Sequence, residues 1–246
     1  GNVNNILQYA PDLKEKYPGN AAEIELIRAQ ALYIRALVHL NLCCCYGQHY
    51  TYTPDASHWG VPNLSILPSA NDPVLRASVY DVYNKRIIPD LEEAIGIFGS
   101  TTMDCYHASA TACEALLARV YLYMEQWQKA SDYATTVIAK VPLTSYENYV
   151  NMYVNIETGS EAIFRLNGFR ASKDLWKFYD PVSPIARPAD TLYTFFDQPD
   201  DIRLELLYAT KDEVKTKACR KFYVAKDVVE DDKHYDPFVS RVSEMY

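Results

Sequence analysis

The chain has 246 residues, which is enough for one large domain or two small ones. Hydrophobic residues make up 49% and charged residues 23%, so the chain can bury a core, and this argues against global disorder. The formal net charge is −8 and no large basic cluster is present, which argues against nucleic acid as a partner.

The first part of the chain has the apolar spacing of helices. Residues 5–17 can form a short helix that Pro11 interrupts, and Asn20 offers an N-cap for a longer helix over residues 21–46. Gly47 is expected to end this second helix. The stripe predicted to face the core consists of Ile24, Ile27, Ala31, Ile34, Val38 and Leu42. Four further residues widen it, so we expect the helix to be covered on more than one side; they are Leu26, Tyr33, Leu37 and Leu40.

A long loop is predicted over residues 48–75, because this stretch holds four prolines and Gly60. It also contains aromatic residues of a kind that can stay exposed, namely Tyr50, Tyr52 and Trp59. A loop of this length inside a compact domain is usually functional or mobile. The loop is therefore the first candidate for a binding site.

Three more helices are predicted over residues 78–98, 108–124 and 126–140. Pro89 lies inside the first of these, so we expect a kink or break near Ile88. The other two form a hairpin in which Ala118 faces Ala130 and lets the backbones approach, while Trp127 is assigned to the core. This order of small, aromatic and apolar positions resembles the tetratricopeptide repeat, which is a scaffold for binding.

After Pro142 the pattern becomes mixed, with short extended segments expected over residues 161–166 and 221–225 and a short helix over 191–196. The final residues, 239–246, are predicted to begin an amphipathic helix. Its apolar side chains are expected to be covered by the chain itself or by a second copy; they are Val239, Val242 and Tyr246.

Several groups of polar residues could carry chemistry, and each has a structural alternative. For Asp200, Asp201 and Arg203 we favour a salt bridge that fixes a loop over an acid–base set, because adjacent carboxylates seldom face one substrate bond. His49 and His58 share a loop but lack an evident third metal ligand. The six cysteines include three in a row, Cys43 to Cys45, and no CxxC pair, so we interpret these three as small buried hydrophobic residues in a helix. The other three cysteines are scattered along the chain.

No catalytic motif is present. The sequence contains no GxSxG, HExxH, P-loop or Rossmann glycine pattern, and no carboxylate constellation typical of a glycoside hydrolase. We therefore expect no enzyme activity, no catalytic residues, no metal and no cofactor.

Five segments, in order, resemble the SusD/RagB family of nutrient-binding outer-membrane lipoproteins. They are IRAQALYIRALVHLNLCCCYGQHY, ACEALLARVYLYMEQWQKASDYATTVI, SYENYVNMYVNIETGSEAIFRL, PADTLYTFFDQPDDIRL and FVSRVSEMY. Members of that family usually begin with a lipidated cysteine and continue with two more repeat hairpins, so the chain is expected to be a short or truncated member. Its lipid anchor is expected to be absent from this sequence.

The resemblance implies a mainly α fold with tetratricopeptide-like helical hairpins, long loops and a few short strands. It implies a single SusD-like domain over residues 1–246. Two hairpins would fill residues 21–142, with the insertion at 48–75, and an irregular region would fill residues 143–246. It also implies binding of a glycan or another oligomeric nutrient at the extracellular face of the outer membrane. The nutrient would be delivered to a SusC-like TonB-dependent transporter.

The ligand residues cannot be transferred from the family, so they are inferred from the aromatic side chains. The chain has 21 tyrosines, and tyrosine and tryptophan both pack helix edges and stack on the apolar faces of sugars. The candidates are Tyr50, Tyr52, Trp59, Trp176 and Tyr179, with Asp55, Asn63 and Arg187 as nearby donors and acceptors. In the structural alternative these aromatics only pin their loops onto the helices.

A second function remains open at this point, a tetratricopeptide adaptor that binds a protein or peptide partner. This function needs only the helices. The aromatic loop at 48–75 and the mixed region after Pro142 favour the nutrient binder, because a plain adaptor requires neither.

Overall fold

The computed structural model describes residues 2–66, 68–69, 71–154, 161–166, 178, 185–196, 201–211, 214–217, 219 and 238–246. The chain divides into two compact units. The helical unit comprises Gly1–Lys140 together with Glu244–Tyr246, and the mixed unit comprises Val141–Ser243. The expected single domain over residues 1–246 stays a prediction.

Two helices open the helical unit, α1 (Asn2–Lys16) and α2 (Ala21–Tyr46), joined by a 3₁₀ turn at Pro18–Asn20. The bounds of α2 agree with the predicted helix, and the N–H of Gly47 donates to the carbonyl of Cys43 at its end. The expected interruption at Pro11 is wrong, because α1 continues through this residue. One missing backbone donor is thus tolerated within this helix.

The core face of α2 differs from the predicted stripe. Ile27, Val38 and Leu42 are exposed, so the stripe is wrong for these three residues. The buried face includes small residues, such as Ala29, Ala31 and Ala36, and α2 packs against both α1 and α4. This face consists of Ala29, Ala31, Leu32, Tyr33, Ala36, Leu37, Leu40 and Cys43. The burial of Ala31 and of the widening residues Tyr33, Leu37 and Leu40 is as predicted, because α2 is apolar on more than one side.

The predicted break near Ile88 is present as a change of helix type. The chain runs through α3 (Val79–Val82) and a π-helical turn (Tyr83–Ile87) into α4 (Ile88–Phe98). The N–H of Ile88 donates five residues back, to the carbonyl of Tyr83. Pro89, which has no N–H to donate, then lies in the first turn of α4, directly after the π-helical turn. The side chain of Ser78 caps α3 by accepting from the N–H of Asp81, 3.0 Å away.

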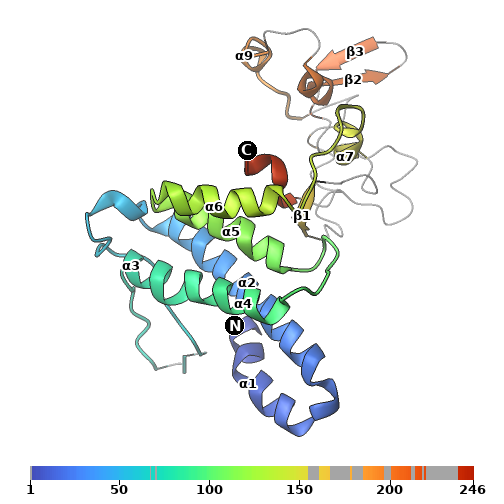
Figure 1. Cartoon of the computed structure of the whole chain (residues 1–246). Coiled ribbons are helices and arrows are strands. Elements are labelled where there is room, and N and C mark those ends of the chain that lie inside the picture. Colours follow the sequence, from blue (N-terminus) through green and yellow to red (C-terminus); the bar gives the residue numbers. More distant parts are fainter. Residues whose placement is uncertain are drawn as a thin grey trace. The chain divides into compact units, whose positions relative to one another are not determined.

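A helical hairpin follows, α5 (Ala110–Tyr123) and α6 (Trp127–Ile138), and the two helices lie side by side in Figure 1. Ala118 and Ala130 are both buried, as the small-residue pattern predicts. The rings of Tyr121 and Tyr133 stack with centroids 5.6 Å apart. Glu125 adopts a φ of 57° in the connecting turn, a left-handed conformation that reverses the chain over three residues.

The mixed unit contains short elements. Among its described residues are the helices α7 (Asn151–Val154) and α9 (Asp190–Tyr193), with 3₁₀ turns at Tyr146–Asn148, Ile202–Leu207 and Val242–Glu244. Strand β1 (Ala162–Arg165) pairs antiparallel with β4 (Phe238–Arg241), and β2 (Tyr208–Lys211) pairs antiparallel with β3 (Val214–Lys217). Its hydrophobic core contains Val150, Met152, Tyr153 and Leu206. The extended segment predicted at 161–166 is present as β1, and the helix predicted at 191–196 is present over Asp190–Tyr193 only. Residues 221–225 lie outside the described residues.

The last segment is a strand followed by a 3₁₀ turn, so the predicted amphipathic helix is wrong. Its residues alternate in burial, with Ser240 and Val242 inside, and this is the period of a strand. The N–H of Val242 donates to the carbonyl of Glu161, 3.1 Å away. The chain itself therefore covers Val242, which is one of the outcomes expected from the sequence.

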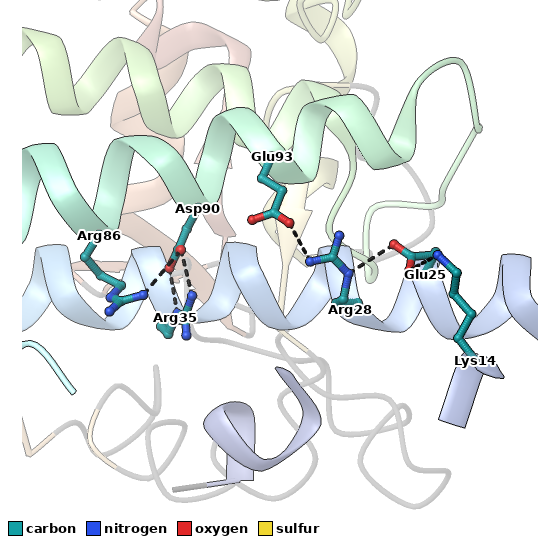
Figure 2. A network of polar contacts seen from close by, with 7 residues as sticks. All are labelled: Lys14, Glu25, Arg28, Arg35, Arg86, Asp90 and Glu93. Atoms are coloured by element: carbon teal, nitrogen blue, oxygen red, sulfur yellow. Dashed lines mark hydrogen bonds and ion pairs between the residues drawn. The ribbon is translucent and has the colours of Figure 1, made fainter. Parts of the chain in front are cut away.

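Ion pairs tie α1, α2 and α4 together, as Figure 2 shows. The guanidinium of Arg35 donates two hydrogen bonds of 2.7 Å to the two carboxylate oxygens of Asp90, and both side chains are almost fully buried. Nearer the surface, Arg28 donates to Glu25 and to Glu93, and Lys14 donates to Glu25. The paired fork of Arg35 and Asp90 fixes the register of α2 against α4.

The loop between α2 and α3 folds back on the segment that enters α3. The N–H of Gly60 donates to the carbonyl of Ala77 (2.8 Å) and the N–H of Ala77 donates to that of Val61 (3.1 Å). Trp59 and Ser78 form an antiparallel bridge. Arg76 then donates from Nε to the Gly60 carbonyl and from Nη2 to the Tyr46 carbonyl, each over 2.6 Å. This part of the loop is thus held by a hydrogen-bonded frame.

Gly60 permits the loop backbone to approach the backbone of Ala77 and Val79 closely. A Cβ atom at this position would lie 3.1 Å from the backbone nitrogen of Val79 and 3.2 Å from the carbonyl oxygen of Ala77. Both atoms belong to the backbone and cannot rotate away. At Gly96 in α4, by contrast, a Cβ atom would meet nothing within 4 Å.

We predict that Asp90→Ala lowers the free energy of unfolding by about 3 to 5 kcal/mol, because it leaves the Arg35 guanidinium buried without its partner. Urea unfolding measures the change. Lys85→Ala is the control, because it removes only the exposed pair with Asp81 on the same helical segment and is expected to have no measurable effect. Equal stability of both variants and the wild type would contradict a role for Arg35 and Asp90 in register.

We predict that Gly60→Ala lowers the free energy of unfolding by about 1 to 3 kcal/mol, since the backbone of the frame must move to admit a methyl group. Gly96→Ala is the matched control and is expected to stabilise by roughly 0.5 to 1 kcal/mol, because it removes a helical glycine at an open position. If the two substitutions have the same effect in urea unfolding, the frame around Gly60 is not tightly packed.

Stability is also predicted to depend on His39. This side chain is buried, and its Nδ1 lies 2.8 Å from the carbonyl of Arg35, to which it donates because a carbonyl only accepts. Burial lowers the pKa of His39 below its ordinary value of 6.5. The neutral ring is thus favoured by folding, so the stabilisation is complete above about pH 6.5 and is lost as pH falls from there toward the folded-state pKa. Melting temperatures measured from about pH 7.5 to about pH 5 should fall in the wild type and fall less in His39→Gln. An identical pH profile for the two proteins would rule out this contribution.

Candidate functional site

The loop carries two of the predicted ligand residues on its surface. The side chain of Trp59 is 68% exposed and that of Tyr52 is 57% exposed. Trp59 belongs to the bridge with Ser78, so its backbone is fixed while its indole faces solvent. Exposed aromatic rings on a fixed backbone form flat apolar platforms that need little ordering when a ligand binds.

Tyr50 has a different position. Its ring packs against Tyr83, with centroids 5.1 Å apart, and its hydroxyl accepts a hydrogen bond from Asn84 Nδ2 at 3.0 Å. The side chain therefore pins the loop to the π-helical turn, which is the structural alternative considered for these aromatics. Tyr50 also lines a small cavity, so part of its ring remains accessible.

Two histidines support Tyr52. The centroids of His49 and His58 lie 5.8 Å and 5.3 Å from that of Tyr52, both in edge geometry. Nδ1 of His58 shares a hydrogen bond of 2.8 Å with the hydroxyl of Thr53. Within the described ranges, no three histidine, cysteine, aspartate or glutamate side chains are grouped so that they could hold a metal ion. The contacts of His49 and His58 are those of a packing role.

The polar residues considered beside the aromatics hold the loop in shape. Asp55 Oδ1 accepts from the N–H of Ser57 at 3.1 Å, and hydrogen bonding to Ser57 lowers the pKa of the Asp55 carboxyl. Asn63 Oδ1 accepts from Arg86 Nε at 2.7 Å. Ala56, between Asp55 and Ser57, has a φ of 53° and forms the tight turn before Trp59. Arg187 is exposed and belongs to the mixed unit.

Trp176 and Tyr179 lie outside the described residues, and their role as ligand residues stays a prediction. The described neighbour Phe178 is exposed, and its carbonyl accepts from the N–H of Ala186 at 2.8 Å.

Arg203 pairs with Asp201, as the sequence predicts, through Nη2 at 2.5 Å from the carboxylate. The same carboxylate accepts from the backbone N–H of Arg203 at 3.0 Å and so caps the 3₁₀ turn at Ile202–Leu207. The hydrogen bonds from Arg203 lower the pKa of the Asp201 carboxyl. The predicted salt bridge is confirmed for these two residues, and Asp200 lies outside the described ones.

The cysteines behave in two ways. Cys43 is buried, as expected of a small hydrophobic residue, and burial raises the pKa of Cys43 to about 12. Cys113 is buried as well. Cys44 and Cys45 are exposed, so the buried role is wrong for them. Successive helical residues point in different directions, and only Cys43 lies on the buried face of α2.

A cavity of about 290 Å³ lies where the loop meets the end of α2 and the end of α5. Its walls include His49, Tyr50, Tyr83 and Tyr123, with Cys43 and Cys44 from α2. The cavity therefore adjoins the loop aromatics and is lined by rings from three segments of the helical unit.

A larger pocket of about 500 Å³ lies on the α5–α6 hairpin. Trp127 lines it and is 61% exposed, so the assignment of this residue to the core is wrong. Trp127 is the first residue of α6, and the buried positions of that helix, Ala130 and Val137, begin one turn later. Sequence reasoning missed this pocket because its other walls come from α5 and from residues 244–246.

None of the helices in the described part of the chain combines the length and the apolar character that crossing a membrane requires.

A comparison with family models finds one match, over residues 2–122, to a SusD-like family described as "Starch-binding associating with outer membrane". The matched region runs from α1 through nearly all of α5 and includes the aromatic loop. No curated protein matches the chain.

Solved structures share the fold over nearly the whole chain. A SusD superfamily protein from Bacteroides thetaiotaomicron VPI-5482 has a TM-score of 0.74 and 24% identity, covering 99% of this chain and 59% of that protein. A SusD-like carbohydrate-binding protein from Bacteroides vulgatus ATCC 8482 has a TM-score of 0.72 and 24% identity, covering 92% of this chain and 50% of that protein. A laminarin-binding SusD-like protein has a TM-score of 0.71 and 22% identity, covering 99% and 62%.

The chain thus spans between 50% and 62% of the length of these three proteins. At such identities the likeness is one of fold, and it agrees with the mainly α, hairpin-containing architecture expected from the sequence. Together with the family match over residues 2–122, it shows that this chain has a SusD-like fold.

Proposed function

We propose that this chain binds an oligosaccharide on the aromatic loop, with Trp59 and Tyr52 as the stacking surfaces. The observation that carries the proposal is the exposure of both rings on a hydrogen-bonded frame. A pyranose ring has an apolar face of C–H groups, which an aromatic face can cover without leaving a polar group unpaired. Tyr50 anchors the loop to the π-helical turn through its contacts with Tyr83 and Asn84.

The frame matters for affinity as well as for shape. A mobile loop would lose conformational freedom on binding, and that loss would reduce the net free energy of binding. Here Arg76 and the backbone bonds between residues 60–61 and Ala77 already order the segment that carries Trp59. Most of the favourable stacking energy would thus remain available for the ligand.

The comparisons support a carbohydrate as the ligand class. The matching family is described as starch-binding and associating with the outer membrane, and similar structures include a laminarin-binding protein and a carbohydrate-binding protein. Because the chain spans only part of those proteins, a carbohydrate ligand for this chain is part of the proposal.

We further propose that the bound oligosaccharide is delivered to a SusC-like TonB-dependent transporter at the extracellular face of the outer membrane. In this proposal the protein is held there by a lipid anchor and acts without a catalytic step. Binding and release are then the whole of its chemistry, and a rigid aromatic surface can perform both.

We predict that Trp59→Ala weakens oligosaccharide binding by roughly 5- to 30-fold, the effect of losing a contact worth about 1 to 2 kcal/mol, and that Tyr52→Ala weakens it in the same direction. Isothermal titration calorimetry with soluble β-1,3-glucan and α-1,4-glucan oligosaccharides gives the affinities.

The matched control is Tyr17→Ala. Tyr17 is also an exposed aromatic, but it precedes α2, whereas the loop follows the other end of this 26-residue helix, about 39 Å away. Loss of binding in Tyr17→Ala, or full binding in both loop variants, would contradict a site on the loop. Capture of peptides without any glycan binding would favour the peptide-binding adaptor instead.

A further inference from the structure

A buried hydroxyl group adjoins the cavity of about 290 Å³ beside the loop. It belongs to Tyr83 in the π-helical turn, a residue that is only 3% exposed and that lines the cavity. Within the described part of the chain, no group forms a hydrogen bond with this hydroxyl. A buried polar group without a partner requires an explanation, and a ligand in the cavity would supply the missing acceptor.

The groups around this hydroxyl indicate that it faces the cavity. The phenol of Tyr83 interacts electrostatically with the thiols of Cys44 and Cys43 and with the phenols of Tyr123 and Tyr50, and all of these residues line the cavity. Burial raises the pKa of Tyr83 above its ordinary value, and the neighbouring groups add to this effect. The hydroxyl is therefore protonated at neutral pH and can donate a hydrogen bond.

The walls of the cavity select an uncharged ligand. Among the described residues, no carboxylate, ammonium or guanidinium group lines it, and every wall residue lies between Cys43 and Tyr123, well inside the chain. Burial raises the pKa of Cys43 to about 12 and that of Cys44 above its ordinary value, so both thiols stay neutral. An ion in the cavity would lose part of its hydration without gaining a counter-charge.

The walls also favour a flat aromatic ligand. Four rings line the cavity, those of His49, Tyr50, Tyr83 and Tyr123. The rings of Tyr50 and Tyr83 already make a tilted contact, with centroids 5.1 Å apart and an interplanar angle of 56°. Aromatic groups attract one another in such tilted and offset arrangements, so a further ring can extend the contact. The volume is close to the lower limit of about 300 Å³ for small-molecule sites, which suits a molecule with a single ring.

We infer that this cavity is a binding site for a small uncharged aromatic molecule that accepts a hydrogen bond from the Tyr83 hydroxyl. The site is separate from the surface of Trp59 and Tyr52, so the inference goes beyond the proposed function. The two are connected by Tyr50, which lines the cavity and pins the loop through its hydrogen bond with Asn84. A molecule in the cavity therefore contacts the residue that holds the loop in place.

The test uses four probes with one ring each. Acetophenone is uncharged and accepts a hydrogen bond, ethylbenzene has a similar shape without the acceptor, benzoate is an anion and benzyltrimethylammonium is a cation. Binding is followed through the rate at which iodoacetamide alkylates Cys44, which lines the cavity. Fragment-ion mass spectrometry separates this thiol from that of Cys45, an exposed neighbour outside the cavity wall, which serves as the internal control.

Acetophenone is expected to slow the alkylation of Cys44 in a saturable way and to leave that of Cys45 unchanged. It is expected to bind roughly 3- to 10-fold more tightly than ethylbenzene, the effect of one hydrogen bond. Neither benzoate nor benzyltrimethylammonium is expected to protect Cys44 at the same concentrations, because the cavity offers no counter-charge.

Tyr83→Phe keeps the ring and removes the hydroxyl, so it is expected to abolish the preference for acetophenone over ethylbenzene. This variant is expected to fold, because the hydroxyl has no hydrogen bond to lose. Tyr121→Phe is the matched control, since Tyr121 is also a buried tyrosine of the helical unit but does not line the cavity. Tyr121→Phe and Trp59→Ala are both expected to bind acetophenone as the wild type does.

Three results would each overturn the inference. They are equal affinity of the wild type and Tyr83→Phe for acetophenone, protection of Cys44 by either charged probe as strong as that by acetophenone, and no protection of Cys44 by any probe. Each of them leaves the proposed function intact, because sugar binding is tested separately with Trp59→Ala and glucan oligosaccharides.

Discussion

The pair of Arg35 and Asp90 is the constraint on which the helical unit depends. A buried guanidinium and carboxylate are costly unless each satisfies the other, so α2 and α4 can meet in only one register. The aromatic loop leaves the end of α2 and returns at the start of α3, which leads through the π-helical turn into α4. The same register therefore sets the distance that the loop must span. Arg76 then donates hydrogen bonds both to the carbonyl of Tyr46 at the end of α2 and to the carbonyl of Gly60 within the loop.

The candidate site follows from this arrangement. Helices supply a rigid base, and the loop places aromatic rings on it with little remaining freedom. The π-helical turn contributes directly, because its Tyr83 and Asn84 hold Tyr50 in place. A local irregularity in the helix, brought about beside Pro89, is thus connected to the surface that we propose for ligand binding. Irregular helical turns of this type are frequent at functional sites.

The sequence predicted those features that depend on local signals. The bounds of α2, the break near Ile88, the hairpin around residues 124–126 and the strand at 161–166 all follow from periodicity, proline chemistry and turn residues. The exposed positions of Tyr52 and Trp59 follow from the composition of the loop. The predictions that were wrong concern features that depend on residues distant in the sequence. The face of α2 that is buried depends on packing against α1 and α4. Strand β4 forms because it pairs with β1. Trp127 is exposed because the buried part of α6 begins one turn after it.

The most direct test of a sugar-binding aromatic surface is a nuclear magnetic resonance titration of the indole N–H signals of the three tryptophans. The signal of Trp59 is assigned by comparison with Trp59→Phe, and the ligand is a soluble glucan oligosaccharide that binds the wild type. Stacking of a sugar on the loop predicts a saturable shift of the Trp59 signal at the concentrations at which calorimetry detects binding. Saturable binding that leaves the Trp59 signal unmoved would contradict it and place the ligand elsewhere on the molecule.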